Sequence, residues 1–159
     1  MLLAIDTYFW LKSVHVLAAV MWVGGNVMLT LLALMTIGER DPVRLAQFAR
    51  QAAFLGAAYF PPLSLLVIGF GFWMVENGFA GWSYDMTWLQ IGIVGWGASF
   101  VIGAGYLGPR AKRISRLLEE RPADDAEVQD LIRRVLVVSR IDAVILLFIV
   151  FDMPAKPWS

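Results

Sequence analysis

The chain has 159 residues, of which 59% are hydrophobic and 16% charged, and its 13 basic and 13 acidic residues leave no net charge. Soluble domains are about a quarter charged, so this excess of apolar residues indicates a membrane protein. A neutral chain has no bulk attraction to nucleic acid, and the lack of cysteine excludes disulfides, thiolate nucleophiles and thiolate-ligated metal or iron–sulfur sites.

Four apolar segments have the length of a transmembrane helix, which needs about 20 mostly apolar residues. They run approximately over residues 8–37, 52–75, 88–107 and 135–151. The first is too long for a signal peptide and lacks a basic leading region, so we expect it to remain as a span. The fourth is the least uniform, because Arg140 and Asp142 lie within it. Since lipid offers no partner for a backbone amide, each span must be helical.

Two of the connections also carry helix signals. Asp41 followed by Pro42 predicts the N-cap and first turn of a helix that runs into the second span. The third span is expected to continue through RAKRISRLLEE until Pro122 ends it. Asp124 or Asp125 then caps a helix that leads into the fourth span.

Basic residues in the loops predict the orientation. The second loop, ENGFAGWSYDMT, has no lysine or arginine, whereas the first and third loops carry Arg40, Arg44, Arg50, Arg110, Lys112, Arg113, Arg116, Arg121, Arg133 and Arg134. We therefore expect a multi-pass protein of the bacterial plasma membrane with both termini outside. Short connections predict an all-α, up-down-up-down bundle of four transmembrane helices with helical cytoplasmic extensions, forming one domain over residues 1–159.

The polar residues of the first span share one face. At about 100° per residue, Lys12, His15, Trp22, Asn26 and Thr30 fall on the same side of the helix. Polar groups in lipid are costly, so this face is expected to turn toward the other helices. His15, the only histidine, has three interpretations: a packing residue bonded to a carbonyl or hydroxyl, a haem or metal ligand, and a proton-transfer group.

The fourth span contributes Arg140 and Asp142, which lie two residues apart and so point to opposite sides. Arg140 is long enough to reach back to the headgroups, whereas Asp142 needs a proton or a partner on another helix. Asn26 and Thr30 lie at a similar depth. We group these four residues as a predicted polar seam, with a purely structural role for Arg140 and Asp142 as the alternative.

Small residues on the third span share one narrow face: Gly92, Gly95, Ser99 and Gly103. This spacing predicts close contact with another helix, within the subunit or between copies. In the second span, the Pro61-Pro62 pair removes two backbone donors and predicts a kink.

Three stretches, FWLKSVHVLAAVMWVGG, WLQIGIVGWGASFVIGAGYLGPRAKRI and DAVILLFIVFDMPAKP, resemble the bacterial integral membrane family called domain of unknown function 2269. The resemblance covers nearly the whole chain and implies a membrane protein without an assigned activity. The Leu-Lys-x-x-His opening is also similar to two further families, the membrane-embedded, haem-b-binding protoporphyrinogen oxidases of bacteria and the copper-resistance D family. The oxidases also use a lysine and a further histidine in later spans, and the third span here has neither.

Three functions follow as hypotheses. The first is a haem-binding or redox-linked membrane module in which His15 ligates haem b, Trp22 packs along the macrocycle and Lys12 pairs with a propionate. Its second axial ligand would be a methionine (Met21, Met74, Met86 or Met153) or His15 of a second copy. The second hypothesis is a non-catalytic structural or accessory subunit of a membrane complex.

The third hypothesis is copper handling or transport, for which one histidine with scattered methionines is a thin ligand set. The sequence offers no nucleophile–base pair, no metal-ligand cluster and no phosphate loop, so a hydrolase or kinase function has no support, and whether the protein is an enzyme of another kind stays open. The expected partners are the lipid bilayer and either further copies of the chain or a membrane complex.

Overall fold

A computed structural model describes residues 2–39, 41–78 and 81–157 of the chain. Within these ranges the regular elements are helices and no strand is present, as the sequence predicts. The elements are α1 (Leu2–Glu39), α2 (Pro42–Ala58), α3 (Phe60–Glu76), α4 (Thr87–Phe100), the π-helical η2 (Val101–Leu107), α5 (Gly108–Glu120) and α6 (Ala126–Ala155).

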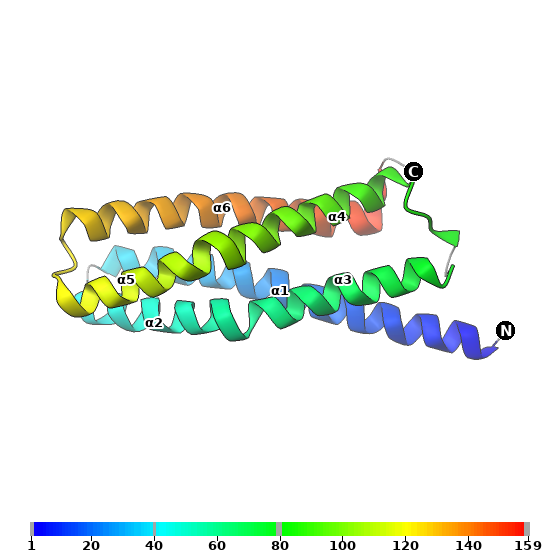
Figure 1. The fold of residues 1–159 in the computed structure, drawn as a ribbon, viewed down its shortest axis with the longest axis horizontal. Helices are drawn as coiled ribbons and strands as arrows, with labels where there is room; N and C mark the ends of the chain where they lie inside the picture. Colours follow the sequence, from blue (N-terminus) through cyan, green and yellow to red (C-terminus); the bar gives the residue numbers. More distant parts are fainter. Residues whose placement is uncertain (1, 40, 79–80, 158–159) are drawn as a thin grey trace.

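The helices lie side by side in antiparallel order (Figure 1). α2 continues into α3, and α4 continues through η2 into α5, so each pair forms one long rod. α1 packs against α3 and α6, α2 packs against α5, and α4 packs against α6. Both termini and the α3–α4 connection lie at one end of the molecule. The α1–α2 and α5–α6 connections lie at the opposite end, which we call the loop end.

With α1 and α6 as single-helix rods, the molecule has four rods in the described residues. Three of them are long and apolar enough to cross a membrane. They are Thr7–Glu39, Pro42–Glu76 and Thr87–Glu120, and they contain the first three predicted spans. The fourth predicted span, residues 135–151, lies within α6. α6 is not one of the three among the described residues, because Arg140, Asp142 and Asp152 interrupt its apolar stretch.

Two aspartates cap helices at the loop end. The Asp41 carboxylate accepts hydrogen bonds from the amides of Val43 (2.9 Å) and Arg44 (3.3 Å), which confirms the predicted start of α2. Of the two aspartates that follow Pro122, it is Asp125 that caps α6, through the amides two and three residues further on (2.9 and 3.3 Å). Both satisfy amides that a helix start leaves without intrahelical partners.

The predicted kink of the second rod is confirmed. α2 ends at Ala58 and α3 begins at Phe60, with Pro61 and Pro62 in its first turn. Tyr59 joins the two helices, and its amide still donates to the carbonyl of Leu55 at 3.0 Å. The break therefore costs few hydrogen bonds, because the prolines occupy first-turn positions where an amide would be unpaired anyway.

The third rod widens to a π-helix at Val101–Leu107. The amide of Gly108 donates to the carbonyl of Gly103, five residues back rather than four. Pro109 explains the widening, since in an α-helix its ring would press on the carbonyl four residues earlier and its missing donor would leave that carbonyl unpaired.

The small residues of this rod differ in how closely they approach another helix. A Cβ added to Gly95 would lie 2.7 Å from Cδ1 of Ile149 on α6, and one added to Gly92 would press on Met153, which confirms close contact at both. The prediction of close contact is wrong for Gly103, where an added Cβ would have no neighbour within 4 Å. The π-helix widens the backbone there and opens a space beside it.

Many large apolar side chains lie on the surface, while some polar ones are buried among the apolar residues of the interior. Phe9, Val94 and Val144 are 63%, 71% and 66% exposed, while Ser64, Ser99 and Asp142 are 2%, 2% and 1% exposed. This distribution matches a lipid environment, where apolar side chains can remain on the surface and polar ones are better placed inside.

Candidate functional site: a polar cavity between the helices

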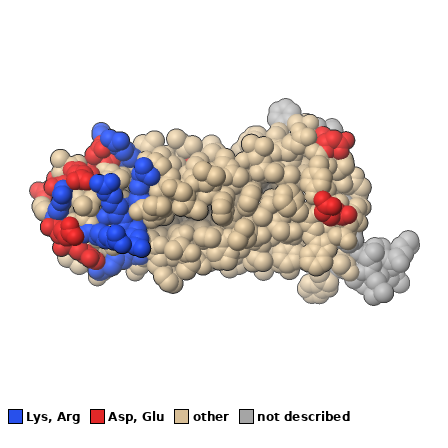
Figure 2. Space-filling view, viewed as in Figure 1, with Lys and Arg blue, Asp and Glu red and all other residues tan. Residues whose placement is uncertain are grey.

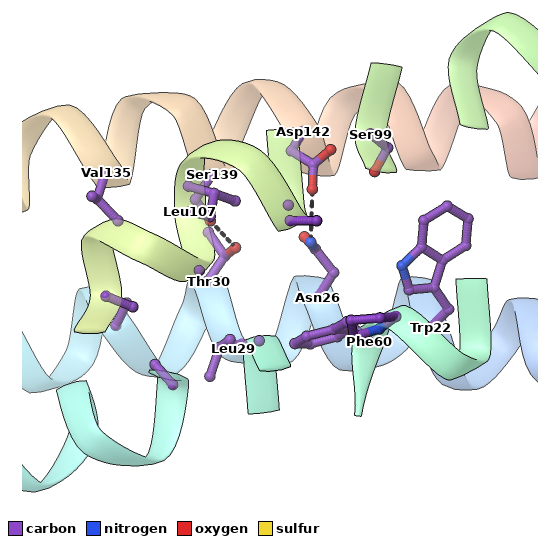
Figure 3. A pocket seen from close by; sticks show the side chains of 18 of the residues that line it. Trp22, Asn26, Leu29, Thr30, Phe60, Ser99, Leu107, Val135, Ser139 and Asp142 are labelled. Carbon is purple, nitrogen blue, oxygen red and sulfur yellow. Dashed lines mark hydrogen bonds between the residues drawn. The ribbon is translucent and has the colours of Figure 1, made fainter. Parts of the chain in front are cut away.

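Two polar contacts join α1 to α6 in successive turns (Figure 3). The side-chain amide of Asn26 donates to Oδ2 of Asp142 at 2.8 Å. One turn along, the hydroxyls of Thr30 and Ser139 share a hydrogen bond of 2.6 Å. Because the helices are antiparallel, the step from Asn26 to Thr30 on α1 matches the step from Asp142 back to Ser139 on α6. The structure thus brings together three members of the predicted seam: Asn26, Thr30 and Asp142.

The other two rods contribute a second set of polar groups. The indole of Trp96 on α4 donates to both the carbonyl (3.0 Å) and the hydroxyl (2.9 Å) of Ser64 on α3. Ser99, one turn further on α4, is buried and lies beside Asp142 in Figure 3. Polar side chains from all four rods therefore face one another in the interior.

Of these polar residues, all but Trp96 line a cavity of about 120 Å³: Asn26, Thr30, Ser64, Ser99, Ser139 and Asp142. It extends along α1 from Trp22 to Ala33, which is about 17 Å at 1.5 Å per residue, and reaches Ala111 and Val135 near the loop end. Small residues on three elements leave this space: Gly56, Gly103, Ala104 and Gly108. A water molecule occupies about 30 Å³ in the liquid, so the cavity has room for a few waters or a hydrated ion.

Two oxygens beside this cavity accept no hydrogen bond of regular geometry within the described part of the chain, although the hydroxyl of Ser99 lies close to the Asp142 carboxyl. They are Oδ1 of Asp142 and Oδ1 of Asn26, and both are shielded from solvent. The orientation of the Asn26 amide follows from its contact, because only its nitrogen can donate to a carboxylate. Buried acceptors of this kind are uncommon, and each requires a donor or a cation to offset the loss of hydration.

Arg140 does not join the seam. Its side chain is exposed and belongs to no ion pair in the described residues. Two residues on a helix are separated by about 200°, so Arg140 points outward when Asp142 points inward. Asp142 is consequently buried without the neighbouring guanidinium as a counter-ion.

His15 faces the bundle and contacts α3. Its Nδ1 lies 2.8 Å from the carbonyl oxygen of Val67, and its ring rests beside Gly71. A carbonyl can only accept, so Nδ1 carries a proton, and in the neutral imidazole Nε2 then holds a free lone pair. This carbonyl contact is the packing partner that the sequence reading proposed for His15, and the tautomer it selects also suits a metal ligand.

The other two residues predicted to hold a cofactor do not converge on His15. Lys12 is exposed, with its ammonium 5.7 Å from the centre of the Tyr8 ring. Trp22 is buried and lines the polar cavity. In the part of the chain that the structure describes, no group of three or more His, Cys, Asp or Glu side chains lies together where it could hold a metal ion.

Sequence reasoning missed three polar residues of the cavity: Ser64, Ser99 and Ser139. Ser139 had a usable signal, since it lies three residues before Asp142 and hence on the same face of the helix. Ser99 was grouped with the glycines for its size alone. Ser64 had no such signal, because its partner Trp96 lies on a different rod.

Long apolar helices with polar groups turned inward define an all-helical integral membrane protein. The chain belongs to the family described as "Predicted integral membrane protein (DUF2269)", whose model matches residues 9–157. The resemblance to this family drawn from the sequence is thereby confirmed, whereas the match does not extend to the haem-binding oxidase and copper-resistance families. No curated protein and no solved structure matches the chain.

Proposed function

We propose that α6 is a fourth span and that the protein is a multi-pass plasma-membrane protein with both termini outside. Support comes from the surface of α6, where Val144 and Leu147 are exposed while Asp142 is buried. Figure 2 supports the orientation, since Lys and Arg gather in a band at the loop end next to a long uncharged body. Basic residues at one end of a bundle are retained in the cytoplasm.

The function proposed for this scaffold is a redox-linked membrane module that binds haem b through His15. The hydrogen bond from Nδ1 to the Val67 carbonyl carries this proposal, because it fixes the ring and leaves Nε2 as the free ligand atom. Haem bound in this way would supply one-electron transfer. The protein would hold the axial imidazole in one orientation and keep the site within the apolar layer.

The remaining residues fit haem only in part. Lys12, at the surface above His15, remains available for a propionate, whereas Trp22 is taken up by the polar cavity. Among the methionines, Met74 is the one to test as a second ligand. It is 3% exposed and lies one turn beyond Gly71, the α3 residue beside the His15 ring.

An absorption spectrum of the protein, purified in detergent, supplied with haem and then freed of unbound haem by gel filtration, tests the proposal. A Soret band is expected, and His15→Ala should abolish or shift it. Met74→Leu should shift the band if Met74 is the second ligand, and Ser13→Ala, an exposed change on the same helix, should leave it unchanged. Haem retained unchanged in His15→Ala would rule out ligation.

A second function, a non-catalytic accessory subunit, is favoured by one observation. The contact between His15 and Val67 already joins α1 to α3 without any cofactor. In this case the spectrum would be featureless with or without added haem, and His15→Ala would lower the stability of the bundle. Copper handling has no comparable support, because the chain has one histidine and no cysteine, and the described residues contain no group of three or more His, Cys, Asp or Glu side chains that could hold a metal.

A further inference from the structure

We propose that the cavity beside Asp142 is a binding site for a hard monovalent cation of the sodium class. This site is separate from His15 and does not depend on haem. Its ligands would be the free Oδ1 of Asp142 and Oδ1 of Asn26, with nearby hydroxyls and water completing the shell.

The charge of Asp142 is the first argument. Its side chain is 1% exposed and belongs to no ion pair among the described residues. Arg140, its nearest basic neighbour in sequence, faces outward. A carboxylate in the interior of a membrane bundle is strongly disfavoured unless a positive charge or a proton accompanies it. The structure therefore leaves Asp142 to be neutralised either by a proton or by a cation from outside the chain, and we propose the cation.

The chemistry of the lining is the second argument. The cation ligands that the cavity lining offers are all oxygen atoms: one carboxylate, one amide oxygen and the hydroxyls of Thr30, Ser64, Ser99 and Ser139. Oxygen donors select hard cations and disfavour soft ones such as Cu⁺. A single carboxylate balances a single positive charge, so a divalent cation would leave excess charge in the apolar layer.

The shape of the cavity is the third argument. It continues from Asp142 past Thr30, Gly103 and Gly108 to the level of Val135, toward the band of Lys and Arg. Trp22 lies at the other extreme of the stretch drawn in Figure 3. A small cation bound at Asp142 would thus lie near the middle of the bundle, at one part of a cavity that extends toward the loop end.

The test is the thermal stability of the purified protein in matched chloride salts. Sodium is expected to raise Tm in a saturable way relative to the same concentration of choline, with potassium weaker. Asp142→Asn keeps the size and the contact with Asn26 but removes the charge, and should abolish the sodium effect. Asp130→Asn, which changes an exposed carboxylate on the same helix, should retain it.

A direct measurement covers the case in which Asp142→Asn folds poorly. Binding of radioactive sodium by the wild-type protein should be saturable and should weaken about tenfold in Ser99→Ala, the loss of one ligand or hydrogen bond. Equal stability in sodium and choline, with no bound sodium, would overturn the proposal.

Infrared spectroscopy separates a cation from a proton. A carboxylic-acid C=O stretch that is present in the wild type, absent in Asp142→Asn and unaffected by sodium would show a permanently protonated Asp142 and overturn the site. Loss of that band on addition of sodium would support it, because the cation would then have displaced the proton.

Discussion

Asp142 accepts a hydrogen bond from Asn26 across the bundle and lies close to the hydroxyl of Ser99, so the effect of changing Asp142 depends on these two partners. Asp142→Asn is expected to fold with a yield near that of the wild type, since an amide oxygen can still accept from Asn26. Asp142→Leu leaves the Asn26 amide buried without an acceptor, at a cost of about 1–3 kcal/mol. The yield of monodisperse protein and its Tm in detergent measure the difference. Equal values for both variants would show that no polar network operates there.

The contact between Asn26 and Asp142 was predictable from the sequence, but its surroundings were not. The helical wheel and the depth of each residue place Asn26 and Asp142 inward at the same level. A wheel gives no information on which rods are neighbours, so the bond between Trp96 and Ser64 had no counterpart in the prediction. For His15 the same reasoning gave the inward direction but not Val67 as its partner.

Gly95 and Gly97 provide a matched pair at the scale of one helix. Both lie on α4, two residues apart, and alanine at each has the same intrinsic effect on helix formation. A Cβ at Gly95 meets Ile149 at 2.7 and 2.8 Å, whereas one at Gly97 has no neighbour within 4 Å. Gly95→Ala should therefore lower the free energy of unfolding by an amount typical of overpacking, about 1–3 kcal/mol, and so lower Tm. Gly97→Ala should leave Tm unchanged. A lower Tm in both, or in neither, would contradict the close packing of α4 on α6.

Helix boundaries were the most predictable feature of the elements. The caps at Asp41 and Asp125 and the break near Pro61 rest on local chemistry, in which the side chain and the affected backbone lie within a few residues. The π-helix at Val101–Leu107 was not predicted, although Pro109 lies just beyond it. Proline signals that an α-helix is disturbed, and the surrounding packing decides whether it kinks, ends or widens.

The orientation in the membrane belongs to the whole molecule, and the lack of cysteine makes it easy to test. Ser83 lies in the α3–α4 connection, at the same end as both termini, and Ala123 lies in the connection before α6 at the opposite end. A cysteine at Ser83 should be labelled by an impermeant thiol reagent in intact cells. One at Ala123 should be labelled only after the cells are opened. The reverse pattern would invert the proposed topology.

Ion pairing at the loop end determines which basic groups remain for lipid. Arg113 and Arg121 pair with Glu127, and Arg133 and Arg134 pair with Asp130. Lys112 and Arg116 belong to no ion pair in the described residues. Exposed pairs of this kind contribute little to stability, so the unpaired charges matter more for contact with headgroup phosphates.

The π-helix between α4 and α5 also sets the rotational phase of the two halves of that rod. A π turn closes over one residue more than an α turn, and one residue corresponds to about 100° of rotation. α5 turns Ile114 toward Leu45 and Val128, and brings Glu119 within 3.8 Å of Arg50, with that extra residue in place. Deleting one residue from the π-helix would leave the packing of α4 against α6 unchanged, but it would rotate the charged surface of α5 away from α2. The added residue therefore acts mainly by rotating α5 relative to α4. Because of this rotation, the inward-facing positions of α4 and those of α5 do not belong to one continuous helical repeat.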